Sequence, residues 1–146
     1  MTSLFERNLR HNRLAELYAY WDKCRAGKPL PLQSSFNAIG LAQWRENLAI
    51  VQVRASRNFT YRFYGVGLKE AFGVDMAGLD VSTLPEDQAA ILRHEYKTVA
   101  QTRKPHWRTY TAWFDDELQT WERIALPLAD NSGTVGLILI CAYRVS

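Results

Sequence analysis

Residues 59–87 read FTYRFYGVGLKEAFGVDMAGLDVSTLPED, a strand-like run that breaks at glycines into shorter pieces. Tyr61 and Phe63 alternate with the residues around them, and this period of two predicts a half-buried strand. Pro85 with two acids behind it suits the first turn of a longer helix. Between these two elements, sharp chain reversals are favoured at four glycines: Gly65, Gly67, Gly73 and Gly78.

The segments on either side also read as regular elements. Residues 9–26 place apolar side chains at intervals of three and four, which predicts an amphipathic helix. Residues 48–53 (LAIVQV) predict a strand that forms a hairpin with residues 60–66 through a turn at residues 56–58. A long helix is predicted over residues 86–103. Three further strands are predicted at residues 107–114, 118–128 and 134–143.

This order predicts an α+β fold with a five-stranded antiparallel sheet, helices against one face and an N-terminal amphipathic helix. In the last strand, the odd- and the even-numbered residues of 137–140 are all apolar, and these two sets point to opposite faces of a sheet. We therefore expect this strand to be central and covered on both faces. A chain of 146 residues with 47% hydrophobic composition is long enough for one well-buried core. We divide it into residues 1–30, the N-terminal helix and the start of a linker, and residues 31–146, the sheet-containing domain.

Composition excludes several classes of protein. No apolar stretch approaches the roughly 18 residues of a membrane span, and the N-terminus lacks the apolar core of a secretory signal, so a cytoplasmic location is expected. Cys24 and Cys141 are expected to be buried reduced thiols. A net charge of +3 is too small to imply nucleic acid binding. Charged residues of the long helix and its exit, Glu95 and Arg108 among them, are interpreted as a solvated face.

The motifs and their order make the chain similar to the PAS domain family. Residues 78–87 match the family pattern of glycine, hydrophobic spacer and Leu-x-Pro-x-Asp before the long helix, and residues 126–133 match its closing hairpin. The chain more narrowly resembles bacterial stand-alone PAS-type proteins. That likeness rests on four short motifs: Tyr20-Trp21, Leu30-Pro31, Tyr61-Arg62-Phe63 leading to Gly65, and Phe72-Gly73.

The resemblance implies a non-catalytic sensory or interaction module whose sheet and helices enclose a cavity. In various relatives this cavity holds haem, flavin or a small organic molecule. Aromatic residues crowd the predicted shell, and they either pack densely without a ligand or leave an apolar pocket with a few polar tips. For the second case we expect a small apolar or anionic ligand, and the candidate ligand-binding residues are Tyr61, Phe63, Phe72, Leu92, Tyr96, Val99 and Trp113.

The sequence leaves the cofactor unknown. His94 is the candidate haem ligand on the long helix, but its helical angle predicts a position facing water. The light-sensing flavin relatives carry a cysteine in their helical middle, and this chain has none between Cys24 and Cys141. The acids at residues 115–117 are interpreted as a solvated turn and not as a metal site. Arg62, between aromatic residues, is either exposed on an edge strand or part of a site.

A partner contact is expected through the first helix. Its apolar side needs cover, and it either lies over the outer sheet face or pairs with a copy of itself. No output domain is recognisable after the last strand, so we expect a homodimer or a partner protein to receive the signal. The candidate interface residues are Leu14, Leu17, Tyr18 and Trp21.

One alternative belongs to a different class of function. Small cone-shaped α+β isomerases or dehydratases hold a general base in an aromatic cavity, and His106 or Asp115 would take that role here. Against this alternative, such enzymes usually place more helix before the first hairpin than this sequence predicts.

Overall fold

The computed structural model describes residues 4–54 and 58–146 and confirms the predicted fold class. Its strands form one antiparallel sheet in the order β2-β1-β5-β4-β3. The strand bounds are β1 (Leu48–Val53), β2 (Phe59–Tyr64), β3 (His106–Phe114), β4 (Glu117–Ala129) and β5 (Val135–Arg144). The last strand is central, as its two-sided apolar pattern predicts. Of the turn predicted at residues 56–58, positions 56 and 57 lie outside the described residues.

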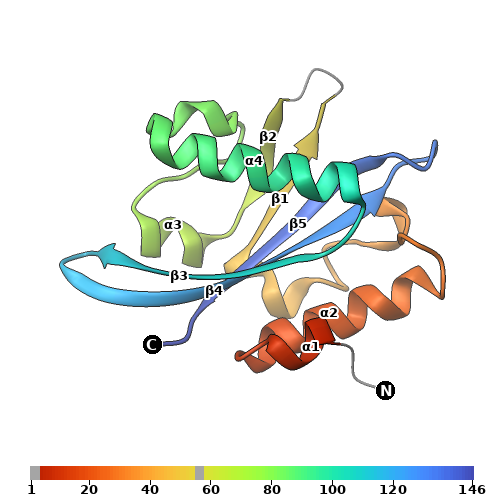
Figure 1. The fold of residues 1–146 in the computed structure, drawn as a ribbon, viewed down its shortest axis with the longest axis horizontal. Coiled ribbons are helices and arrows are strands. Elements are labelled where there is room, and N and C mark those ends of the chain that lie inside the picture. Colours follow the sequence, from red (N-terminus) through yellow and green to blue (C-terminus); the bar gives the residue numbers. More distant parts are fainter. Residues whose placement is uncertain (1–3, 55–57) are drawn as a thin grey trace.

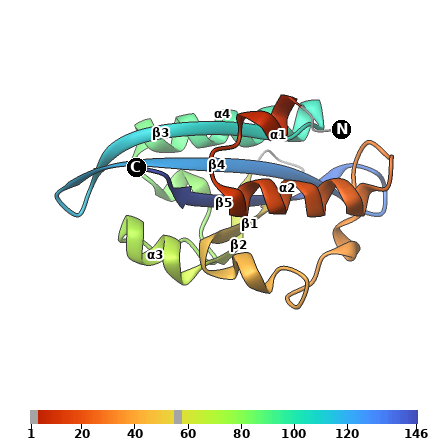
Figure 2. The same cartoon turned by 90° about the horizontal axis from the view of Figure 1, so that it is seen from below.

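Helices cover the sheet on both sides, with α4 and α2 on opposite faces (Figures 1 and 2). The α-helices are α1 (Leu4–Asn8), α2 (Asn12–Arg25), α3 (Val66–Phe72) and α4 (Glu86–Thr102). Short 3-10 helices follow the linker and precede α4: η1 (Gln33–Ser35), η2 (Ala42–Asn47) and η3 (Val81–Thr83). The sequence predicted one helix over residues 9–26, whereas the structure has a separate α1 and begins α2 after the N-cap residue His11. The His11 imidazole Nδ1 accepts a hydrogen bond from the backbone N–H of Arg13 at 3.1 Å.

The apolar stripe of α2 packs inside this chain. Leu14, Leu17, Tyr18 and Trp21 are all buried, and the Trp21 indole Nε1 donates a hydrogen bond to the Pro127 carbonyl at 2.9 Å. Of the two positions foreseen for the first helix, the structure has the one over the outer sheet face. The four residues predicted as an intermolecular interface are therefore core residues of the chain. A dimer or partner contact stays a prediction, but this stripe is not available to make it.

The glycines between β2 and α4 have two different roles. Gly73 and Gly78 have φ angles of 74° and 81°, the left-handed region that favours glycine in turns, as predicted. Gly65 has a φ of −64° and Gly67 lies within α3, so neither is a reversal of this kind. A Cβ atom at Gly65 would instead lie 2.4 Å from the Glu46 carbonyl oxygen. This glycine lets the start of α3 pack against the backbone of η2.

The hairpin of β3 and β4 extends past the rest of the sheet (Figure 1). Its turn consists of Asp115 and Asp116, which have positive φ angles of 53° and 61°. Trp113 and Leu118 lie opposite each other next to this turn and are 71% and 53% exposed. Asp115 and Asp116 therefore sit at a hairpin tip, where water solvates them, whereas Glu117 begins β4 and pairs with Arg144 at the surface.

The remaining expectations concern thiols and the membrane. Cys141 is buried and Cys24 half-buried, and both are free. Burial raises the pKa of the Cys141 thiol, so it is an unreactive core side chain. In the described ranges, every helix is too short or too polar to cross a lipid bilayer.

Candidate functional site

A cavity of about 330 Å³ lies between the sheet and the helices α3 and α4. Its walls are apolar and aromatic side chains from α3, α4 and the neighbouring segments, and from the inner face of the sheet. Its polar lining consists of four tyrosines, two arginines and one glutamine: Tyr61, Tyr64, Tyr96, Tyr110, Arg108, Arg123 and Gln88. A concave apolar space with a few convergent polar groups is the usual form of a small-molecule site.

The tyrosine hydroxyls are held in the neutral form. The hydroxyls of Tyr61 and Tyr96 share a hydrogen bond of 2.6 Å. Burial raises the pKa of Tyr96 to about 12, although the nearby Arg123 acts in the opposite direction. Burial also raises the pKa of Tyr61, Tyr64 and Tyr110. Near neutral pH these hydroxyls therefore act as uncharged donors and acceptors.

Arg123 brings a buried positive charge to the cavity from β4. Its Nη2 donates to the Glu95 carboxylate, and its guanidinium carbon lies 5.1 Å from the centroid of the Tyr110 ring. Burial alone would lower the pKa of Arg123, but the Glu95 carboxylate and the tyrosines outweigh burial and raise this pKa overall. Among the described residues, the Arg123 Nε has no hydrogen-bond partner.

Glu95 is the acid that balances Arg123, and the prediction that Glu95 belongs to the solvated face of the long helix was wrong. Its side chain is only 5% exposed. One oxygen accepts from Arg123, and the other lies 2.8 Å from the Nδ1 of His106 on β3. Glu95 lies beside Tyr96 on α4, so it turns toward the sheet with that residue. Helical periodicity alone could not predict the burial of Glu95, because Arg123, which balances its negative charge, is 28 residues away in the chain.

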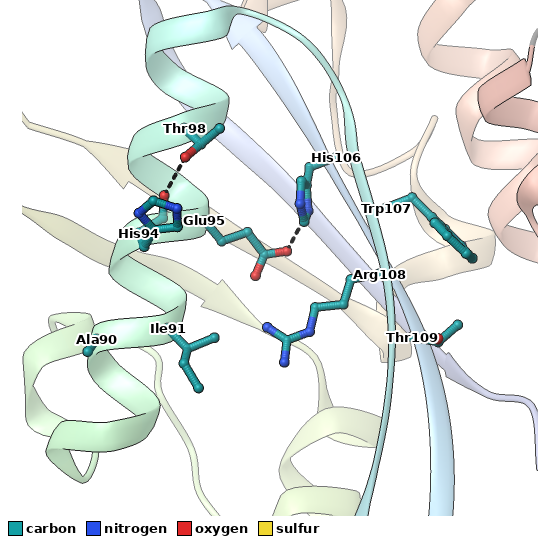
Figure 3. A pocket seen from close by; sticks show the side chains of 9 residues that line it. All are labelled: Ala90, Ile91, His94, Glu95, Thr98, His106, Trp107, Arg108 and Thr109. Atoms are coloured by element: carbon teal, nitrogen blue, oxygen red, sulfur yellow. Dashed lines mark hydrogen bonds and ion pairs between the residues drawn. The ribbon is translucent and has the colours of Figure 1, made fainter.

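A second hollow, a groove of about 710 Å³, lies between α4 and the edge strand β3 (Figure 3). Figure 3 shows Glu95 reaching from α4 toward His106, with the Arg108 side chain extending from β3 toward α4. Ile91 and Arg108 line both the groove and the cavity. These two side chains therefore mark the boundary between the two hollows. The prediction that Arg108 is part of a solvated face holds only in part, because it also lines the cavity.

The structure gathers five of the seven predicted ligand residues at the cavity: Tyr61, Phe72, Leu92, Tyr96 and Trp113. Phe63 and Val99 are not part of the lining. Phe63 is half-buried on β2, and Val99 is a buried residue one turn beyond Tyr96 on α4. That these residues bind a ligand stays a prediction. The sequence analysis did not identify Arg123 as a residue of the site. The signal that could have indicated it is its position as the one arginine in the mostly apolar predicted strand at residues 118–128.

The predicted exposure of His94 is confirmed, since it is exposed on α4 and lines the groove, not the cavity. Of the two alternatives for Arg62, the structure has the exposed position on the edge strand β2. The enzyme alternative needs His106 or Asp115 inside the aromatic cavity. His106 instead lines the groove and contacts Glu95, whereas Asp115 lies in the exposed hairpin turn. The general base foreseen for that alternative is therefore not in the cavity. The described residues contain no cluster of side chains suited to a metal ion.

The fold and the cavity define the chain as a sensor-type α+β domain, with a five-stranded antiparallel sheet and helices enclosing an internal space. Residues 9–141 match the sequence description of the PAS domain, which covers most of the chain. The protein belongs to the PAS domain family. Domains of this family are in general sensory and non-catalytic. No match was found among curated proteins.

Several solved structures have the same fold. A sensory box sensor histidine kinase from Vibrio cholerae is 13% identical with a TM-score of 0.53, and the match covers 94% of this chain and 99% of that one. VqmA bound to DPO is 14% identical with a TM-score of 0.59, over 73% of this chain and 56% of that one. The dark-state LOV domain of the blue-light photoreceptor Aureochrome1 is 16% identical with a TM-score of 0.54, over 76% and 84%. At these identities the likeness shows the fold alone.

Proposed function

We propose that this protein is a cytoplasmic sensory PAS domain that binds a small organic molecule in the cavity between α4 and the sheet. The observation that carries the proposal is the cavity itself, where about 330 Å³ of space adjoins a buried arginine and four tyrosines. The bound or empty state of the cavity is then passed to a second copy of the chain or to a partner protein.

The chemistry of the lining supports a ligand over a densely packed core. A cavity lined only by hydrocarbon can remain dry and empty, but polar groups need partners when they are buried. The Arg123 Nε lacks such a partner among the described residues, and Tyr61 and Tyr96 satisfy each other in part. A ligand that combines an apolar body with hydrogen-bonding groups fits both parts of this lining.

Size and residue chemistry favour a small organic molecule over haem or a flavin adduct. The cavity volume lies at the lower end of the roughly 300–1,000 Å³ typical of ligand pockets. The long helix presents His94 to solvent, away from the cavity. Neither of the two cysteines, Cys24 and Cys141, lines the cavity. Of the described residues, those that line the cavity therefore include no histidine to bind iron and no cysteine to form a thiol adduct.

Native mass spectrometry and an absorption spectrum of freshly purified protein test the proposal. We expect a bound small molecule, or binding of fragments from an NMR screen, and loss of that binding in Ala112→Leu, which fills the cavity from β3. Thr111→Leu is the matched control, because it adds a similar side chain to the neighbouring exposed position. If Ala112→Leu and the wild-type protein bind equally, the cavity is not the site.

Signal transfer by a protein contact is the second part of the proposal. The support is the usual use of PAS domains in dimers and partner complexes, together with the exposed Trp113 and Leu118 at the hairpin tip. Because the apolar stripe of α2 is buried, this helix would contribute only its outward-facing residues to a contact with a second copy or a partner protein. Size-exclusion chromatography with light scattering measures the oligomeric state. A folded protein that remains monomeric at high concentration and captures no partner would contradict this part.

A further inference from the structure

We infer that Arg108 recognises an anionic group of the ligand, so that the cavity selects small amphipathic monoanions such as aromatic carboxylates, held with the carboxylate at the boundary with the groove. This inference rests on the proposed ligand-binding function and adds the class of ligand and its orientation. The relevant finding is that the two arginines of the cavity are in different electrostatic states.

Arg123 is already neutralised. Its guanidinium pairs with Glu95, whose second oxygen contacts His106 at 2.8 Å, so the carboxylate is held from two strands at once. With the side chain of Glu95 only 5% exposed, a competing anion would have to displace a buried carboxylate. An anion that displaced Glu95 from Arg123 would leave the Glu95 carboxylate buried without a counter-charge, and that is costly. Arg123 itself therefore suits an uncharged acceptor group.

Arg108 has no such acid. In the part of the chain that the structure describes, its recorded contact is the Tyr110 ring, 5.9 Å from the guanidinium carbon. Arg123 lies directly opposite Arg108 on β4, and Glu95, which lines the groove with Arg108, pairs with Arg123. The other titratable groups around Arg108 are the neutral tyrosines of the cavity and the imidazoles of His94 and His106 in the groove. Among residues 4–54 and 58–146, Arg108 is thus a cation without an acidic partner, and it lines both hollows.

Position fixes the orientation of the ligand. Arg108 lies where the cavity meets the groove, whereas Phe72 and Leu92 contribute apolar walls to the cavity. An apolar ring among those walls removes hydrocarbon surface from water, while a carboxylate at Arg108 keeps part of its hydration through the groove. One charged end and one apolar end therefore match the site in a single orientation.

Matched pairs of probes test the inference, for example phenylacetate with phenylacetamide and indole-3-acetate with indole-3-acetamide. Binding is measured by NMR titration at pH 7.5 on the intact protein and on Arg108→Gln. We expect each acid to bind about tenfold more tightly than its amide, and Arg108→Gln to abolish the difference without weakening the amides. Raising the salt concentration should weaken the acids more than the amides. Arg62→Gln, an exposed arginine on the other edge strand, is the matched control and should change nothing.

The outcomes separate this inference from the proposed function. Equal binding of acids and amides, or an acid preference that survives in Arg108→Gln, overturns the inference but leaves the cavity as a site. Binding of amides that Ala112→Leu abolishes supports the cavity independently of Arg108. If neither member of any pair binds, and the purified protein carries no molecule, both the proposed function and the inference fail. Circular dichroism shows whether each variant is folded before its binding is measured.

Discussion

Glu122 and Arg123 are consecutive residues of β4 whose side chains stabilise opposite faces of the sheet. Arg123 faces α4 and pairs with Glu95 beside the cavity. Glu122 is completely buried on the other face, where its carboxylate accepts hydrogen bonds from the backbone N–H groups of Arg10 and His11 and from the Trp107 indole. A single strand thus connects the lining of the cavity with the segment that begins α2.

Replacing Glu122 should detach the start of α2. In Glu122→Gln, one carbonyl oxygen replaces two carboxylate oxygens that accept from three donors, so at least one buried N–H loses its partner. We expect the free energy of unfolding to fall by about 2–4 kcal/mol, measured by urea denaturation. Hydrogen exchange at the backbone amides of Arg10 and His11 should become faster.

Glu117→Gln is the control for this variant. Glu117 lies on the same strand but pairs with Arg144 at the exposed surface, where ion pairs add little stability. It should leave the unfolding curve unchanged. Equal stability of Glu122→Gln and the wild-type protein would show that the buried carboxylate does not hold the N-terminal segment.

The buried tyrosines predict a loss of stability at high pH. An unfolded tyrosine ionises near pH 10, whereas burial raises the pKa of Tyr96 in the folded protein to about 12. Above pH 10 the unfolded state therefore releases a proton that the folded state retains, and stability falls as the pH rises toward 12. Tyr96 alone should account for about 2–3 kcal/mol of this loss.

Urea denaturation between pH 8 and pH 12 measures this effect, and Tyr96→Phe should show a shallower decline than the wild-type protein. The comparison is made between slopes, because Tyr96→Phe also leaves the Tyr61 hydroxyl without its partner at every pH. If both proteins lose stability with the same slope, Tyr96 is not a source of the alkaline sensitivity.

Gly65 should tolerate no larger residue. The Cβ of Gly65→Ala would lie 2.4 Å from the Glu46 carbonyl oxygen, and backbone must move to relieve this contact. We expect a loss of about 1–3 kcal/mol in the free energy of unfolding. Gly73→Asn is a useful comparison, because Gly73 has open space around it and asparagine accepts its left-handed backbone. A similar cost at both positions would argue against the close approach as the reason for Gly65.

Removing the N-terminal helices should destabilise the sheet. A protein that begins at Pro31 lacks the cover over Ile124, Leu126 and Leu128, which share the Glu122 face of β4 and are at most 1% exposed. Exposing each of these side chains costs about 1.5–3 kcal/mol. We expect the truncated protein to aggregate, as measured by light scattering. A soluble, folded monomer would show that α1 and α2 are dispensable for the fold.

Local patterns were sufficient to predict most of the fold. The period of two in β2, the apolar run of β5 and the glycines at positions 73 and 78 each depend on residues close together in the chain. Such signals predicted five strands, the long helix and the central position of β5. They failed at α1 and at Gly65, because the start of α2 depends on Glu122 and the requirement for Gly65 depends on Glu46. Both partners belong to other elements.

The sequence by itself determined the fold class, the family and the aromatic character of the shell, because periodicity and turn residues act over short distances. Only the tertiary structure decided the polar features of the site. It buries Glu95 against Arg123 across 28 residues, leaves Arg108 without an acidic partner among the residues that the structure describes, and covers the apolar stripe of α2 with the sheet of the same chain. The state of a charge depends on what lies next to it in space, and neighbours that come from distant segments leave no periodic signal in the sequence.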